Sequence, residues 1–567
     1  MTNTGYNFRK YRSFQTLNLT DRTWPNNTIT KAPIWCSVDL RDGNQALVEP
    51  MTVEQKTRMW NLLVSMGFKE IEVGFPSASQ PDYDFVRKII DDGLVPDDVT
   101  IQVLVQAREH LISKTFEALK GAKKAIVHVY NSTSTTQREK VFRLDRQGIT
   151  DIAVQGAKWV KEYATRHPDT DWQFQYSPES FTGTEMDFAA DVCNAVIEVW
   201  QPTPEKPCII NLPATVEVST PNVFADQIEW MCRHLHHRDA VIVSVHTHND
   251  RGTGVAASEL GLLAGADRVE GTLFGNGERT GNLDIVTMAM NLYSQGIDSG
   301  IDCSNMDHII QIYKYCNQLE VHPRHPYAGE LVFTAFSGSH QDAIRKCLSD
   351  QQHESHWNVA YLPIDPADLG RKYEEVIRIN SQSGKGGVTY VMEQDHGYRL
   401  PRPLQIHFSQ VIQRVSEQTR KEVSPQTIWE NFRSSYVEVD APFTLKEYSI
   451  QRDVDKQTDQ IKAVIDGEGQ KRVLTGTGNG PISAFASAVR KQMGIEFELV
   501  DYNEHAIGEG EDTMAVTYMQ IRVNGNVCFG VGENPDIVMA SLIALLHAVN
   551  NAVKAGWVTP VSEGQSA

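Results

Sequence analysis

The sequence predicts an α/β protein: a (β/α)8 barrel of the TIM type, then helical connector subdomains, then a C-terminal α+β domain. Three observations carry this prediction. Between about residues 30 and 310, apolar runs rich in β-branched residues alternate with helical stretches, as in a parallel sheet built from βαβ units. The first turn, DLRDGNQ, lacks the G-x-G-x-x-G typical of a doubly wound open sheet, the alternative fold. Residues 433–567 contain an internal repeat.

The predicted barrel strands are short runs bounded by polar residues, glycine or proline. They occupy residues 34–40, 70–75, 100–106, 125–130, 172–176, 208–212, 241–246 and 268–274. Eight such units in roughly 280 residues match the size of a TIM barrel. We expect the interiors of these runs to be apolar and the polar residues to gather at their carboxyl ends.

Beyond residue 310 the alternation of strands and helices is lost. Helical stretches at 306–319 and 404–419 are separated by proline-marked breaks, which is typical of a helical connector. We therefore expect a barrel with an N-terminal extension over 1–329, linker subdomains over 330–432 and a C-terminal domain over 433–567.

Two similar stretches define the C-terminal domain: TGTGNGPISAFASAV at 475–489 and FGVGENPDIVMASLI at 529–543, at an offset of 54 residues. Strand-like alternation precedes each, so each half is expected to hold two or three strands, a glycine turn and a helix that begins at Pro481 or Pro535. Duplicated units of this ββα type pack about a pseudo-twofold axis. The repeat alone leaves open a bare dimerisation domain, in which the glycines serve only the turns.

Composition and charge argue against several classes of protein. The chain has 53 Lys and Arg against 72 Asp and Glu, a formal net charge of −19, which is unsuited to binding nucleic acid. No run approaches the roughly 18 apolar residues of a membrane span, and the N-terminus lacks the apolar segment of a secretory signal. The 8 cysteines form no C-x-x-C pair, which indicates a reducing compartment. We expect a cytoplasmic protein that binds neither nucleic acid nor membrane.

Polar and ionisable side chains follow the predicted strands, at the face where TIM barrels carry their active sites. The sharpest signal is the pair His246 and His248, which lie two residues apart and so point to one side of a strand, about 6–7 Å apart. With Asp42, after the first strand, they could form a metal site with positions open to substrate oxygens. The alternative is a pair of hydrogen-bonded histidines lining a pocket. As a metal site, this set of two imidazoles and a carboxylate would accept Mg²⁺, Mn²⁺ or Zn²⁺.

Eight strings, taken in order, resemble the acyl-CoA-condensing metalloenzyme barrels, and within them the long-form 2-isopropylmalate synthase family. They are WCSVDLRDGNQAL (35–47), EIEVGFPSAS (70–79), VHVYNSTS (127–134), YSPESFTGTE (176–185), NLPATVE (211–217), HTHND (246–250), GNGERTGNLD (275–284) and SGSHQDAI (337–344). The resemblance implies an acyltransferase of leucine biosynthesis. Such enzymes join acetyl-CoA, 2-oxoisovalerate and water to give 2-isopropylmalate and CoA. It also implies a divalent metal ion, Mg²⁺ first, with K⁺ as an activator.

The resemblance also assigns roles at the metal and at the keto acid. Asp42, His246 and His248 are the implied metal ligands, with Asn282 beside or on the metal. Arg41 would face the keto-acid carbonyl. Glu72 would hold Arg41, with direct participation as the alternative. The keto-acid carboxylate and isopropyl group would contact His128, Ser177, Thr215, Leu104, Tyr130, Asn211 and Pro213.

For the acetyl-CoA half, the resemblance implies Glu179, His340 and Tyr373. The last two would come from the connector of the partner subunit in a domain-swapped homodimer. His340 paired with Glu179 is the candidate base, and Tyr373 would activate water or protonate the thiolate. Simpler alternatives are that Glu179 orients Arg41 and that His340 caps a connector helix.

Residues 433–567 resemble a leucine-binding regulatory domain with allosteric control of the barrel. The implied pocket residues are Tyr502, Ala506, Thr513 and Ala515, with Thr513 standing where a smaller residue is usual. Since helix N-termini bind carboxylates, the leucine carboxylate is expected at the helices that begin near Pro481 and Pro535.

Two other functions are alternatives to this one. Sister synthases that make citramalate or homocitrate differ only in the pocket for the keto-acid tail, and the apolar Leu104 and Pro213 argue against the second carboxylate that homocitrate synthesis requires. A catalytically silent leucine sensor would not need the intact set of Arg41 and metal ligands.

Overall fold

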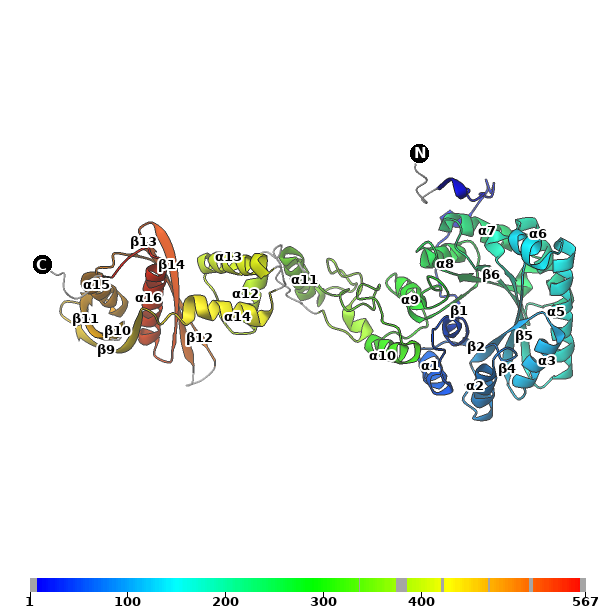
Figure 1. Cartoon of the computed structure of the whole chain (residues 1–567), viewed down its shortest axis with the longest axis horizontal. Coiled ribbons are helices and arrows are strands. Elements are labelled where there is room, and N and C mark those ends of the chain that lie inside the picture. Colours follow the sequence, from blue (N-terminus) through cyan, green and yellow to red (C-terminus); the bar gives the residue numbers. More distant parts are fainter. Residues whose placement is uncertain are drawn as a thin grey trace. The chain divides into compact units, whose positions relative to one another are not determined.

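The computed structural model describes residues 8–335, 337–373, 385–419, 423–467, 470–508 and 513–560. The chain divides into two compact units (Figure 1). The first comprises Met1–Phe333 and Pro363–Tyr373, and the second comprises Thr334–Leu362 and Glu374–Ala567.

The first unit is a closed barrel of parallel strands in sequence order, in which β1 pairs with both β2 and β8. Every predicted strand is present, so the barrel prediction is confirmed. The strands are β1 (Ile34–Ser37), β2 (Glu70–Gly74), β3 (Thr100–Gln106), β4 (Lys124–Ser132), β5 (Asp171–Glu179), β6 (Cys208–Ala214), β7 (Val241–Thr247) and β8 (Arg268–Gly271).

Helices follow the strands and surround the barrel (Figure 1). Side-chain caps fix several of their starts; at the first, Thr52 and Gln55 form a reciprocal capping box. The helices of this unit are α1 (Val53–Ser65), α2 (Gln80–Asp91), α3 (Glu109–Ala118), α4 (Thr135–Gln137), α5 (Arg146–Arg166), α6 (Met186–Trp200), α7 (Pro221–His234), α8 (Gly254–Leu263), α9 (Ile285–Tyr293) and α10 (Met306–Asn317).

A single π-helical turn, Asp39–Gly43, follows β1 and carries Arg41 and Asp42. The buried carboxylate of Asp39 accepts hydrogen bonds from the Ser37 hydroxyl at 2.8 Å and the Leu273 amide at 3.0 Å, just beyond β8. The hydrogen bond from Leu273 ties the π-helical turn to the end of β8. Isolated π turns of this kind often occur at functional sites.

The interior of the barrel differs from the sequence prediction. Instead of apolar run interiors, the strands place polar side chains in the closed centre of the barrel, where they hydrogen-bond to one another across strands. The expectation of apolar run interiors is therefore wrong. Successive residues of a strand face opposite sides, so a polar residue can point into the barrel from a run whose other members pack against helices. The buried polar residues are Glu72, Gln102, His128, Gln175, Ser244, Arg268 and Glu270.

The second unit begins with the predicted helical connector, which comprises α11 (Gly338–Gln351), α12 (Lys385–Gln394), α13 (Arg402–Thr419) and α14 (Pro425–Phe432). Side chains of α12 to α14, such as Phe408 and Phe432, form one apolar cluster with Tyr518 and Val531 of the following domain. These three helices therefore cover one face of its second sheet.

Two βββα repeats follow. The first has β9 (Phe443–Asp453), β10 (Thr458–Gly467), β11 (Gln470–Gly478) and α15 (Pro481–Met493); the second has β12 (Glu498–Ile507), β13 (Met514–Val523), β14 (Asn526–Asn534) and α16 (Ile537–Lys554). Each repeat thus has three antiparallel strands, one more than the ββα type. The first helix begins at Pro481 as predicted. The second begins at Ile537 after the cap Asp536, so the prediction that Pro535 opens it is wrong.

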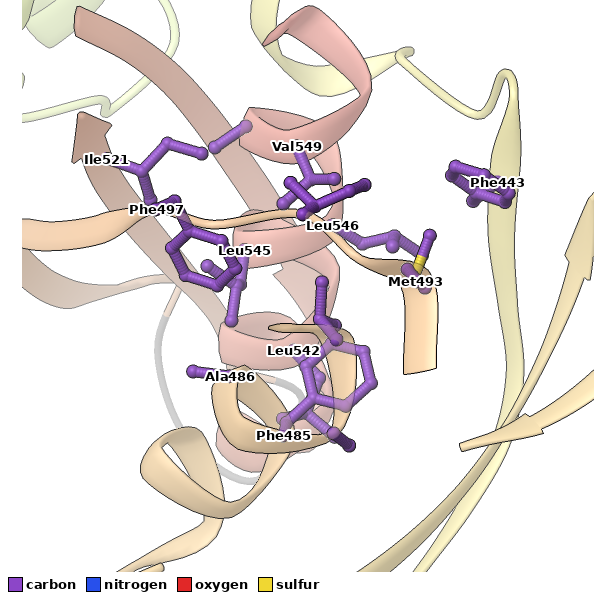
Figure 2. Packing of buried hydrophobic residues seen from close by; sticks show 14 of the residues in the cluster. Phe443, Phe485, Ala486, Met493, Phe497, Ile521, Leu542, Leu545, Leu546 and Val549 are labelled. Atoms are coloured by element: carbon purple, nitrogen blue, oxygen red, sulfur yellow. The ribbon is translucent and has the colours of Figure 1, made fainter. Parts of the chain in front are cut away.

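Both repeats contribute to one core, in which side chains of α15 and α16 meet (Figure 2). Four glycines of the repeat, Gly476, Gly478, Gly530 and Gly532, lie within β11 and β14 instead of in turns, and Gly480 is the N-cap residue of α15. A Cβ on Gly532 would stand 2.0 Å from the carbonyl oxygen of Ala540, so glycine allows α16 to pack close to its sheet. Of the described residues, α16 alone is long and apolar enough to cross a membrane, but 61% of it is buried in this core.

Candidate active site

A pocket of about 280 Å³ lies at the carboxyl ends of the barrel strands. This is the face predicted for the site. Twelve of the residues implied by the resemblance line it: Arg41, Asp42, Leu104, His128, Tyr130, Ser177, Glu179, Asn211, Pro213, Thr215, His246 and His248. Three more lining residues were not anticipated: Gln45, Glu278 and Arg279. Sequence reasoning gave these no role because they lie beyond the strand ends, where no strand pattern fixes the direction of a side chain.

Three side chains in this pocket form a candidate metal site. One ligand atom from each of Asp42, His246 and His248 lies within 4.8 Å of the others. Asp42 Oδ2 is 3.3 Å from His246 Nε2 and 3.9 Å from His248 Nε2. That oxygen and Asn282 Oδ1 are buried and accept no hydrogen bond of standard geometry among the described residues. Two imidazoles, a carboxylate and an amide oxygen are a donor set that suits a divalent cation.

The pKa values of the two histidines in this cluster shift in opposite directions. Burial opposes protonation of His246, but its bonds to Asp42 and Glu270 raise its pKa to about 9. Burial and the neighbouring His246 lower the pKa of His248 to about 4. Although burial raises the pKa of Asp42, Arg41 and the two imidazoles hold it well below its usual range. Asp42 therefore stays ionised, as a metal ligand must be.

The buried charges around the site do not balance. Four carboxylates, three of them buried, face two guanidinium groups in linked ion pairs. With both imidazoles neutral, as metal ligands are, the cluster carries two excess negative charges. Buried charge is costly unless it is paired. A divalent cation at Asp42, His246 and His248 would neutralise the excess. The carboxylates are Asp42, Glu70, Glu72 and Glu270, and the guanidinium groups are Arg41 and Arg268.

Arg41 is held in place by two carboxylates. Its Nη1 donates to Asp42 Oδ1 at 2.7 Å, and its Nε donates to Glu72. This leaves Asp42 Oδ2 directed at the candidate metal position. Glu72 thus contacts Arg41, as expected for a residue that orients it.

The chain of contacts continues from Glu72 across the pocket. Glu72 Oε2 lies 2.8 Å from His128 Nδ1, and His128 Nε2 lies 2.7 Å from Ser177 Oγ. The Ser177 hydroxyl also accepts from Asn211 Nδ2 at 3.0 Å. Since Glu72 is ionised and accepts from Nδ1, the hydrogen on Ser177 is oriented through His128. Arg41, His128 and Ser177 therefore form one ordered polar wall.

Apolar and neutral groups line the pocket near this wall. Leu104 and Pro213 supply apolar surface, and Tyr130 Oη accepts from Gln106 Nε2 at 3.2 Å. Thr215 Oγ1 accepts a hydrogen bond from the Ser180 amide at 2.9 Å. Ser180 directly follows β5 and has a left-handed backbone conformation. Glu179, the last residue of β5, accepts from the Ser132 hydroxyl. An apolar patch beside cationic and hydroxyl donors suits a small branched oxo acid.

Four implied barrel-site residues do not line the pocket: Glu72, whose contacts are given above, and Asn282, Tyr373 and His340. Asn282 forms a backbone bridge with His248, which places it next to a candidate ligand. Tyr373 belongs to the barrel unit and is half-buried. His340 belongs to the second unit, where it is exposed on α11 and stacks on Tyr361 at 4.0 Å. Ser337, not His340, is the cap residue of α11, so the alternative role of His340 as a helix cap is wrong.

The implied leucine-site residues come together only in part. Ala506 and Ala515 are direct cross-strand partners, and Tyr502 pairs with Met519 on the same two strands. Thr513 is half-buried and directly precedes β13. At the N-terminus of α16 the Asp536 carboxylate accepts from the first-turn amides of Val538 and Met539. An anionic cap therefore occupies those two amides. The expectation that this terminus takes part in binding the leucine carboxylate stays a prediction.

Comparison with known proteins covers almost the whole chain. The family profile described as HMGL-like matches residues 32–312. A profile described as the alpha-isopropylmalate synthase post-catalytic domain matches 330–393, and the LeuA allosteric (dimerisation) domain matches 422–553. The 2-isopropylmalate synthase of Pseudomonas entomophila L48 is 56% identical over 547 residues, 96% of this chain and 97% of that protein. The enzyme of the same name from Rhodospirillum rubrum is 56% identical over 548 residues, 96% and 98% of the two chains.

Proposed function

This chain belongs to the 2-isopropylmalate synthase family, and we propose from that premise that it condenses acetyl-CoA with 2-oxoisovalerate and water. The products are 2-isopropylmalate and CoA, and the reaction is the first committed step of leucine biosynthesis. The observation that carries the proposal is the cluster of Asp42, His246 and His248 beside Arg41 in a partly apolar pocket. We place this activity in the cytoplasm.

Asp42, His246 and His248 would hold a divalent cation, with Asn282 beside it; Mg²⁺ is our first choice, Mn²⁺ and Zn²⁺ are alternatives, and K⁺ is an activator. The cation supplies Lewis-acid polarisation of the keto-acid carbonyl. Arg41 would add a fixed positive charge where negative charge develops on that oxygen. Its bonds to Asp42 and Glu72 hold it before substrate arrives, so little reorganisation is needed in the transition state.

The polar wall would bind the carboxylate of 2-oxoisovalerate through His128, Ser177 and Thr215. The isopropyl group would rest on Leu104, Tyr130, Asn211 and Pro213. Burying two more carbons than pyruvate offers is worth about 0.8 kcal/mol for each carbon, so the pocket would discriminate by roughly tenfold or more.

On the acetyl-CoA side, Glu179 stands at the pocket and is the residue there that could take part in removing the methyl proton. We propose that His340 acts with Glu179 as the base and that Tyr373 serves thioester hydrolysis. We further propose a domain-swapped homodimer, in which the connector comes from the partner subunit. The functional segments would then be a catalytic barrel (1–329), linker subdomains (330–432) and a leucine-binding regulatory domain (433–567).

Mixed subunits test the shared site. A His340→Ala variant and a His248→Ala variant would each be inactive alone. If each site combines two chains, refolding them together restores part of the activity, because some heterodimers hold one site with both residues intact. No recovery with demonstrated heterodimers would contradict the swapped arrangement.

A thiol assay for CoA release tests the function itself. With acetyl-CoA and a panel of keto acids, 2-oxoisovalerate is expected to give the highest kcat/KM. Comparable values for pyruvate would assign the chain to citramalate synthesis, and 2-oxoglutarate as the best substrate would assign it to homocitrate synthesis. Saturable leucine binding with no CoA release from any of these acids would indicate a sensor.

A further inference from the structure

Glu270, on β8, lies directly behind the proposed metal ligand His246. Its carboxylate is fully buried and belongs to none of the strings that carry the family resemblance. Its two oxygens accept hydrogen bonds from five donors: His246 Nδ1 at 2.8 Å, Asn211 Nδ2 at 3.2 Å, Arg268 Nη1 at 2.7 Å, Gln175 Nε2 at 2.7 Å and Gln102 Nε2 at 3.2 Å. No further donor is needed to satisfy it.

We propose that Glu270 is a positioning residue for the metal site, which fixes the tautomer and the ring orientation of His246. The inference rests on the proposed metal-dependent function. An ionised carboxylate can only accept hydrogen bonds, so His246 must donate from Nδ1. In the neutral imidazole that ligates a cation, the lone pair then lies on Nε2, the atom that stands 3.3 Å from Asp42 Oδ2. His246 is thereby presented to a cation in one state instead of several.

Arg268 keeps Glu270 in place. Its guanidinium group is fully buried and donates to Glu70, Gln102, Ser244 and Glu270. A buried guanidinium without a paired anion is strongly disfavoured, as is the lone carboxylate. The pair therefore fixes both the charge and the position of the group behind His246.

The other imidazole lacks this arrangement: within the described part of the chain, His248 Nδ1 makes no hydrogen bond. Glu70 offers a matched control. It accepts from Arg268 Nε, on the same guanidinium group that holds Glu270, and this bond involves no implied metal ligand. Glu70→Gln therefore makes the same charge change in the same network, without the contact to His246.

The test measures Mn²⁺ affinity of the full-length protein from the electron paramagnetic resonance signal of free Mn²⁺. Glu270→Gln is expected to raise the Kd by about 10–100-fold, the usual effect of losing such an orienting partner. Glu70→Gln is expected to change it by less than threefold. If Glu270→Gln does not fold, Glu270→Asp replaces it, because the aspartate keeps a charge opposite Arg268 but retreats from His246 Nδ1 by one methylene.

Each outcome is decisive. A rise of tenfold or more for the Glu270 variant, with less than threefold for Glu70→Gln, supports positioning through His246. Equal weakening by both variants would mean that only buried negative charge matters, and a smaller rise at Glu270 would mean that the contact does not orient His246; either result overturns the inference. A parent protein that binds no Mn²⁺ would overturn the metal site as well, which separates that failure from the failure of Glu270 alone.

Discussion

Ala506 and Ala515 face each other across β12 and β13, whereas the corresponding pair in the first repeat, Arg452 and Asp459, forms an ion pair of 2.9 Å. The two pairs correspond because a tyrosine stands the same number of residues before the first member of each, Tyr448 in one repeat and Tyr502 in the other. Two small side chains leave room where the first repeat is filled by long charged ones. We therefore expect one leucine site in each chain, in the second repeat.

Ala515→Leu is expected to weaken inhibition by leucine, because the added carbons would occupy the space of the ligand's isobutyl group. The KM for 2-oxoisovalerate should change little, since the barrel is untouched. Leucine titrations of initial rates measure both. Arg452→Leu, at the matching strand of the first repeat, is the control and should leave inhibition unaltered. If Ala515→Leu stays as sensitive as the parent and leucine raises only the KM for the keto acid, leucine acts at the barrel.

Removal of the metal is expected to abolish condensation, because the keto-acid carbonyl would lose its polarising cation. Mg²⁺ or Mn²⁺ added after chelation should restore the rate. His248→Ala should lower kcat by orders of magnitude and reduce metal occupancy, with the circular dichroism spectrum unchanged. Unchanged turnover after exhaustive chelation would contradict the assignment of Asp42, His246 and His248.

Leu104→Phe is expected to shift the preference among keto acids towards pyruvate. The larger ring fills pocket volume that the isopropyl group would occupy. We predict at least a tenfold loss in kcat/KM for 2-oxoisovalerate, with pyruvate, measured on the same variant, as the internal control. An equal loss for both substrates would show that Leu104 does not contact the tail.

Asp39 should give the folding stability a dependence on pH. Burial raises the pKa of its carboxyl to about 7, against about 3.9 in an unfolded chain. The folded protein therefore binds more protons between pH 4 and 7, so this group lowers the free energy of unfolding as pH rises through that window, by about 4 kcal/mol when fully ionised. Asp39→Asn should flatten that part of the profile in urea unfolding followed by fluorescence. An identical slope in parent and variant would contradict the shift.

The strands of the barrel could be predicted because each is a separate β-branched run between turn residues, and the ends of those runs located the pocket. The polar centre of the barrel could not be predicted, because the direction of a side chain such as Arg268 or Glu270 is known only once the strand register is known. One signal was available: Glu70 with Glu72 and Arg268 with Glu270 are charged pairs at a spacing of two, the spacing that puts both side chains on one face.

The C-terminal domain shows a similar limit. The repeat predicted its duplication, but the helix after Pro535 begins two residues later, because Asp536 takes the N-cap position and Pro535 then lies before the cap. The roles of His340 and Tyr373 depend on how the chain assembles, and a local sequence pattern does not encode assembly.

The central claim is that this barrel joins an acetyl unit to 2-oxoisovalerate with the help of a divalent cation. Its most direct test supplies acetyl-CoA labelled with ¹³C at both acetyl carbons and identifies the product by mass spectrometry. We predict 2-isopropylmalate that carries both labelled carbons, formed in equal amount to free CoA and absent after chelation. CoA released without labelled 2-isopropylmalate, or labelled product formed at full rate in the chelated enzyme, would contradict the account.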